Sequence, residues 1–142
     1  MPRYVVLRHE PSPGKKFSAH FDLMLERDGA LWTWALPELP VAGQAVWGRR
    51  LDDHRLAYLD YEGPISGDRG AVRRIAAGEY VLRNAAPDRL EAELRGAGFS
   101  GILALEREVE SPYRWRVALS PTCTVEAPVL PEKTISPSRN SS

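Results

Sequence analysis

Residues 18–38 read SAHFDLMLERDGALWTWALPE, and this stretch is typical of a β-hairpin. Apolar residues alternate with other residues from Phe21 to Leu25, which is the pattern of a strand with one buried face. Asp28-Gly29 offers a two-residue turn, and a second apolar run begins at Leu31. The stretch therefore predicts two antiparallel strands and favours a fold made of short strands.

The other face of the first strand carries an unusual set of side chains. Taken every second residue, it consists of His20, Asp22, Met24 and Glu26. Side chains two residues apart in a strand point the same way and are separated by about 6.6 Å along it. His20 and Asp22 can therefore reach one metal ion from a rigid backbone. The simpler alternative is a hydrogen-bonded His–Asp pair on a solvated sheet face.

Turn residues punctuate the whole chain, with 11 glycines and 12 prolines in 142 residues. Nine short runs of β-type sequence lie between them, at residues 4–7, 19–26, 31–36, 57–62, 71–75, 79–83, 90–94, 101–107 and 115–119. Many short strands at close spacing favour an all-β fold, here a small closed or partly open β-barrel of about eight strands. One or two short helical turns are expected within residues 10–18 or 48–56.

The composition is that of a soluble globular protein, with 43% hydrophobic and 27% charged residues. Nineteen basic residues balance nineteen acidic ones, which argues against a surface that binds nucleic acid indiscriminately. Cys123 is the single cysteine, so no internal disulfide can form. No apolar run is long enough for a signal peptide or a membrane span, and we expect a cytoplasmic protein without membrane contact.

We expect one folded domain over residues 1–126 and a disordered C-terminal tail over residues 127–142. From Ala127 onward, prolines alternate with Ser, Thr and Lys. Few apolar residues remain there to offset the entropy that ordering would cost.

Two further histidines stand beside predicted strands. His9 ends the first strand, and His54 precedes the run 57–62, which carries Tyr58. Because each of the three histidines adjoins a strand, we expect the mouth of a barrel to gather them.

Three blocks of this sequence resemble the 3′-phosphoesterase domain of bacterial DNA ligase D. They are VLRHEPS (6–12), HFDLMLERDGALWTWALPELP (20–40) and DDHRLAYLDYEGPISGDRG (52–70). The pattern of that family is a histidine after the first strand, then H-x-D-x-R-L-E-x-D-G and S-W-A-V-P-K-G-P. A segment E-D-H-P-L-x-Y-x-x-F-E-G and a glycine-rich turn follow. The resemblance covers about residues 4–119 and is weakest in its last part.

The resemblance implies roles for five residues. His9, His20 and Asp22 match the family's metal ligands, which usually serve manganese, and His54 and Tyr58 match residues that contact the scissile phosphate. Two imidazoles and one carboxylate suit a divalent ion with open positions for water and phosphate. A histidine and a phenol can donate hydrogen bonds to charge that develops on phosphate oxygens.

The chain departs from the family pattern at two charged positions. Met24 stands where the family has arginine, and a thioether cannot make the bidentate phosphate contact of a guanidinium. Glu38 stands where the family has lysine. Arg69 in the turn SGDRG, or Arg50, can supply the missing cation, although such a turn more commonly only connects strands.

These observations lead to a first hypothesis and two alternatives. The first is a metal-dependent phosphoesterase, slow because of Met24, that removes a 3′ ribonucleotide or 3′ phosphate from DNA in break repair, with a separate ligase or end-joining protein as a possible partner. The second is a catalytically weak or inactive metal-containing module that binds nucleic-acid ends or a repair partner. The third is a metal enzyme that acts on another phosphoester. The four tryptophans can stack on bases, although tryptophans in such strands are more commonly core residues.

Overall fold

A computed structural model describes residues 1–14 and 18–121 of the chain. These residues form nine strands and one short 3₁₀-helix, η1. The elements are β1 (Arg3–Glu10), β2 (His20–Arg27), β3 (Ala30–Leu36), β4 (Val46–His54), η1 (Leu56–Leu59), β5 (Gly63–Pro64), β6 (Ala71–Ala86), β7 (Arg89–Ala97), β8 (Gly101–Arg107) and β9 (Arg114–Ser120). The predicted tail and Cys123 lie outside the described residues.

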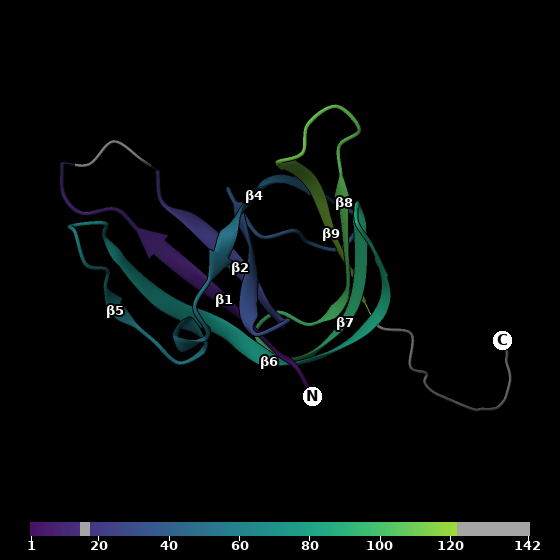
Figure 1. Ribbon diagram of the computed structural model, residues 1–142, viewed down its shortest axis with the longest axis horizontal. Coiled ribbons are helices and arrows are strands. Elements are labelled where there is room, and N and C mark those ends of the chain that lie inside the picture. The colour runs from purple at the N-terminus through teal and green to yellow at the C-terminus, as the bar shows by residue number, and fades with distance from the viewer. Residues whose placement is uncertain (15–17, 122–142) are drawn as a thin grey trace, which may run out of the picture.

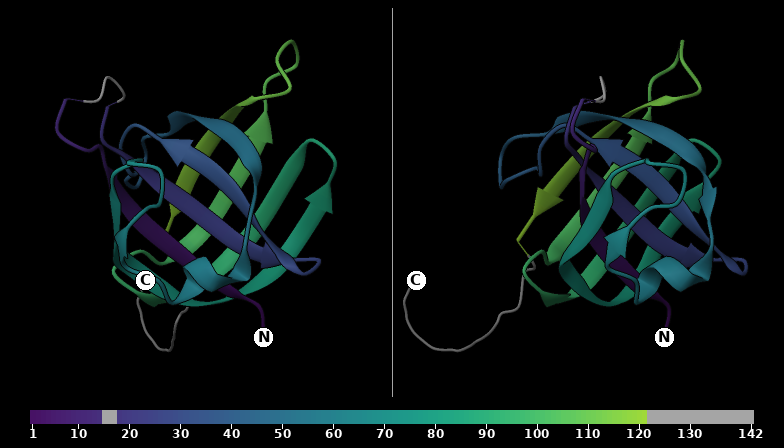
Figure 2. Two further views of the ribbon diagram at one scale, coloured as in Figure 1. Left: turned by 60° about the vertical axis from the view of Figure 1, so that its left-hand side comes forward. Right: turned by 90° about the vertical axis from the view of Figure 1, so that its left-hand side faces the viewer.

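The strands form one antiparallel sheet in the order β1-β2-β3-β4-β9-β8-β7-β6-β5 (Figures 1 and 2). An additional pairing of β1 with β6 joins the first strand to the eighth in this order. Eight strands therefore close into a ring, and the short β5 pairs with the free part of β6. The predicted all-β fold of about eight strands is confirmed as a closed, barrel-like ring.

The β2–β3 hairpin has the two-residue connection that its sequence predicts. Asp28 and Gly29 adopt φ values of 53° and 80°, as a type I′ turn requires at both central positions. This turn sets the register in which Asp22 pairs with Ala35 and Met24 with Thr33. The metal-ligand candidates of β2 are therefore fixed by local sequence.

The ring has a buried interior and a second buried cluster on its outer face. The interior cluster takes side chains from almost every strand, including Tyr4, Trp34 and Trp115. The outer cluster consists of Val5, Leu7, Met24, Leu31, Leu59, Ile65 and Val72. Because β1 contributes alternate residues to both clusters, its apolar run YVVL is buried on both faces.

The segment between β4 and β6 covers the outer cluster. Leu59 and Ile65 are buried against it. Arg74 of β6 holds the segment by donating a 3.3 Å hydrogen bond to the Leu59 carbonyl and lying 3.7 Å from the Glu62 carboxylate. This segment, residues 55–65, therefore covers one part of the ring's outer face.

Two predictions of local structure need correction in this region. Residues 57–62 are not a strand, because burying Leu59 on the outer cluster turns the chain into η1. A short helical turn is present as expected, but it is η1 (Leu56–Leu59) and begins only at the end of the range 48–56; residues 48–54 belong to strand β4, which pairs with both β3 and β9. The predicted runs 71–75 and 79–83 form a single long strand, β6.

No helix in the part of the chain that the structure describes is long and apolar enough to cross a membrane.

Candidate metal centre

The β1–β2 pair brings three predicted ligands together. His9 and His20 are register partners, with ring centroids 4.9 Å apart, and Asp22 follows His20 on the same face of β2. The nitrogen and oxygen atoms that these residues offer all lie within 4.8 Å of one another. The cluster continues the alternation of Val5 and Leu7 on β1, so it lies on the outer face of the ring. His9 and His20 are therefore gathered as expected, but on the outer face of the ring and not at a barrel mouth.

Backbone carbonyls orient both imidazole rings. His9 Nε2 lies 2.8 Å from the carbonyl oxygen of Arg69, and His20 Nδ1 lies 3.2 Å from that of Ser18. A nitrogen that faces a carbonyl must carry a proton to donate, which leaves the other nitrogen of a neutral ring with a lone pair. His9 Nδ1 and His20 Nε2 are those other nitrogens, and both face Asp22. This arrangement is the outer-shell support typical of metal-ligating histidines.

The Asp22 carboxylate is buried between the two rings, with its side chain 4% exposed. His9 Nδ1 is 3.5 Å from Oδ2, and His20 Nε2 is 3.1 Å from Oδ1. Although His20 Nε2 lies this close, Oδ1 accepts no hydrogen bond by geometric criteria from the residues that the structure describes. A buried carboxylate oxygen without such a partner, facing two imidazole nitrogens, fits a divalent cation as its missing partner.

The charges of the cluster are strongly coupled. The interaction with Asp22 raises the pKa of both His9 and His20, against the opposing effect of their burial. Burial by itself raises the pKa of Asp22, but the interactions with His20 and His9 outweigh it and lower that pKa overall. Without a metal, therefore, His9 and His20 keep their protons to a higher pH than free imidazoles do.

A cavity of about 270 Å³ opens beside the cluster and is lined in part by the covering segment, residues 55–65. Its walls include His9 and Asp22 from the cluster, together with the predicted phosphate-contacting residues His54 and Tyr58. The rings of His54 and Tyr58 meet edge to face at 5.7 Å, and His54 Nδ1 lies 2.9 Å from the Asp52 carbonyl. The structure thus brings His54 and Tyr58 to the same cavity as the cluster.

The two predicted cations have different positions. Arg69 lines the cavity, and its guanidinium donates to the carbonyl and hydroxyl oxygens of Ser66. Arg50 reaches elsewhere, with its guanidinium 3.0 Å from the Asp53 carboxylate and 4.9 Å from the Trp34 ring centre.

Arg55 is a cavity residue that the sequence reasoning missed. It is exposed and lines both this cavity and a neighbouring one of about 250 Å³. The family pattern has proline at this position, directly after the histidine that corresponds to His54. This departure could have identified Arg55 from the sequence. It adds a guanidinium to a chain that has Met24 in place of the family arginine.

Met24 lies at the border between the cavity and the outer cluster. It lines the cavity, yet it is only 1% exposed because it packs among the apolar residues of that cluster. Glu38, the second departure, is exposed in the loop that follows β3. Its neighbour Pro37 lines a different groove, on β3, β4 and β9.

Comparison with known proteins confirms the resemblance drawn from the sequence blocks. A family model described as "DNA Ligase D 3'-phosphoesterase domain" matches residues 13–107, which begin just after His9. The multifunctional non-homologous end joining protein LigD of Pseudomonas aeruginosa is 40% identical over 65 residues, covering 44% of this chain and 7% of that protein. The protein of the same name from Mycobacterium bovis is 36% identical over 97 residues, covering 62% of this chain and 13% of its own length. The chain therefore spans a small part of these relatives.

Proposed function

We propose that this chain, which belongs to the DNA ligase D 3'-phosphoesterase domain family, is a metal-dependent phosphoesterase that acts on DNA 3′ ends. Its substrate would be an end that carries a 3′ ribonucleotide or a 3′ phosphate during break repair. The observation that carries this proposal is the cavity whose walls include His9 and Asp22 of the metal cluster together with His54 and Tyr58. We further propose Mn²⁺ as the metal and a separate ligase or end-joining protein as a partner.

The residues of the cavity have different roles in the proposed phosphoryl transfer. His9, His20 and Asp22 would hold a divalent cation, which would supply Lewis-acid polarisation of the phosphoryl group. When His54 donates Nδ1–H to the Asp52 carbonyl, a second proton on Nε2 lets the ring also donate to a phosphate oxygen. The Tyr58 hydroxyl offers another donor to charge that develops in the transition state.

Arg55 and Arg69 are the guanidinium groups that we propose for the phosphate in place of the family arginine. Both line the cavity. Arg69 is tethered to Ser66, whereas the Arg55 side chain forms no hydrogen bond or ion pair with the residues described here. Arg55 is therefore able to turn to a bound phosphate without breaking an existing contact.

The direct test is cleavage of a DNA primer that ends in a single 3′ ribonucleotide, with purified protein and Mn²⁺. The wild-type protein should release the terminal nucleotide slowly, and His20→Ala should not. Arg83→Ala, which removes an exposed cation from β6, serves as the matched control and should cleave like the wild type.

A metal-binding module without catalysis is the second candidate function, and Met24 is the observation that favours it. Metal-dependent binding of the same primer by both wild type and Arg83→Ala, with no product from either, would replace the enzyme proposal with this one. Absence of both binding and cleavage would contradict the two candidates together.

We expect the stabilising effect of Mn²⁺ to grow with pH. Asp22 raises the pKa of His9 and His20 above the ordinary value of 6.5, so without metal their contribution to stability is complete below about pH 6.5 and is lost as the pH rises through the raised values. Metal binding needs the unprotonated nitrogens and strengthens over the same range. The melting temperature measured with Mn²⁺, minus that measured with EDTA, should therefore be larger at about pH 8 than at about pH 6. A difference that stays constant or shrinks would argue against histidine ligands.

A further inference from the structure

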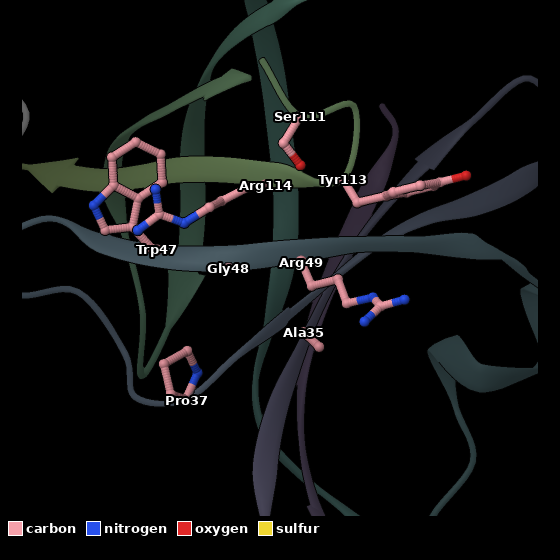
Figure 3. Close-up of a pocket in the computed structure, with 8 residues that line it drawn as sticks. All are labelled: Ala35, Pro37, Trp47, Gly48, Arg49, Ser111, Tyr113 and Arg114. Carbon is pink, nitrogen blue, oxygen red and sulfur yellow. The ribbon is translucent and has the colours of Figure 1, made fainter. Parts of the chain in front are cut away.

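A second, larger groove of about 460 Å³ lies on the outer face of β3, β4 and β9 (Figure 3). Its lining includes two aromatic residues and two arginines, namely Trp47, Tyr113, Arg49 and Arg114. Ala35 and Pro37 complete its floor on the β3 side. None of these residues belongs to the cavity beside the metal cluster.

The register of the sheet connects this groove to the metal centre. Asp22 of β2 pairs with Ala35 of β3, Ala35 pairs with Arg49 of β4, and Arg49 pairs with Arg114 of β9. Residues that pair directly across an antiparallel sheet point to the same face, so this row runs over the outer face of the ring. With strands about 4.8 Å apart, the backbone of Arg49 is about 10 Å from that of Asp22, and that of Arg114 is about 14 Å away.

The aromatic residues of the groove are exposed, in contrast to the tryptophans of the core. Trp47 is 42% exposed and Tyr113 is 60% exposed, whereas Trp34 and Trp115 are buried inside the ring. Large aromatic side chains that stay in water on a sheet face are available for stacking with a ligand.

Each aromatic ring of the groove is accompanied by a guanidinium. Arg114 lies over Trp47 at 3.9 Å from the ring centre, and Arg49 lies 5.9 Å from that of Tyr113. Figure 3 shows Arg49 and Tyr113 extending in the same direction, away from Trp47 and Arg114. The Glu108 carboxylate accepts a hydrogen bond from Arg114, but Arg49 forms no ion pair within residues 1–14 and 18–121. The groove therefore offers positive charge and flat stacking faces to one ligand.

We propose that this groove binds the single-stranded nucleotides that precede the processed 3′ end. The inference rests on the proposed function. If the metal centre holds the terminal phosphate, the row from Asp22 to Arg114 lies under the strand that precedes this phosphate. Bases stack on aromatic rings and on guanidinium planes without regard to sequence, while arginines neutralise the backbone phosphates. This arrangement gives a chain with no net charge a local strand-binding surface.

Binding of a fluorescent single-stranded DNA of about 12 nucleotides, measured by anisotropy, tests the proposal. Trp47→Ala and Tyr113→Ala should each weaken binding at least about fivefold, and Trp47→Phe should restore most of the loss because it keeps a stacking ring. Arg114→Ala should weaken binding, whereas Arg95→Ala should not. These two arginines are matched, with side chains 48% and 55% exposed and each joined to one glutamate.

The same variants separate this inference from the proposed function. Unchanged affinity of Trp47→Ala and Tyr113→Ala for the single strand, in folded proteins, would overturn the groove proposal even if the wild type cleaves primers. Weakened binding in these variants together with no cleavage by the wild type would support the groove as a site for single-stranded DNA, but it would contradict the phosphoesterase and with it the assignment of that strand to a processed end. If Trp47→Ala and Tyr113→Ala weakened only the binding of blunt duplex DNA, the proposal would also be overturned, because it assigns the groove to a single strand.

Discussion

Replacement of Asp22 by asparagine is expected to weaken Mn²⁺ binding at least about 100-fold and to reduce primer cleavage to background. Asp22 is the only carboxylate of the three-residue cluster and lies between the two imidazole nitrogens. Loss of a group that merely supports a ligand typically costs about 10–100-fold in metal affinity, and a ligand itself contributes more. Asparagine keeps the shape of the side chain, so the loss reports on charge and coordination.

Isothermal titration with Mn²⁺ measures this effect, and the melting temperature in EDTA shows that the variant is folded. Asp60→Asn is the matched control, because that carboxylate is 73% exposed and pairs with Arg3 at 2.8 Å, outside the cavity. Asp60→Asn should bind Mn²⁺ like the wild type. If folded Asp22→Asn did so as well, Asp22 could not be a ligand and the proposed metal centre would have to be abandoned.

The fold was predictable from sequence where short-range rules decide it. The alternation in β2 and the turn Asp28-Gly29 specify a hairpin and its register without help from the rest of the chain. Residues 57–62 could not be assigned in this way. Their apolar pattern fits a strand, but η1 forms because Leu59 packs on an outer-face cluster built from distant strands.

The candidate site was predictable to a similar degree. His20 and Asp22 share a strand face by alternation alone, whereas the approach of His9 depends on the β1–β2 register. That the cluster lies outside the ring could not be foreseen, because β1 is apolar on both faces and does not reveal which one is the interior. Composition likewise could not distinguish the exposed Trp47 from the buried Trp34.

Met24→Arg is expected to raise the single-turnover rate at least about tenfold. Met24 lines the cavity about 6.6 Å along β2 from Asp22, which is within reach of a guanidinium directed at a bound phosphate. A preorganised donor to the transition state is typically worth about 100–1,000-fold in rate. We expect only part of this factor because the position is 1% exposed, so that a longer side chain overpacks the outer cluster at a cost of about 1–3 kcal/mol in stability. Met24→Leu, which adds no charge, should leave the rate unchanged or lower it.

A second variant, Arg55→Ala, shows which guanidinium contacts the phosphate in the wild-type protein. If Arg55 supplies the guanidinium in the wild type, Arg55→Ala should lower the rate about 100-fold. In the Met24→Arg background the same change should cost much less, since a second guanidinium then contacts the phosphate. Single-turnover rates of the four proteins on 3′-ribonucleotide and 3′-phosphate primers complete this double-mutant cycle. Independent effects, in which Arg55→Ala costs the same factor in both backgrounds, would show that the two arginines serve different groups. A wild-type rate that neither change alters would transfer the role to Arg69, which also lines the cavity.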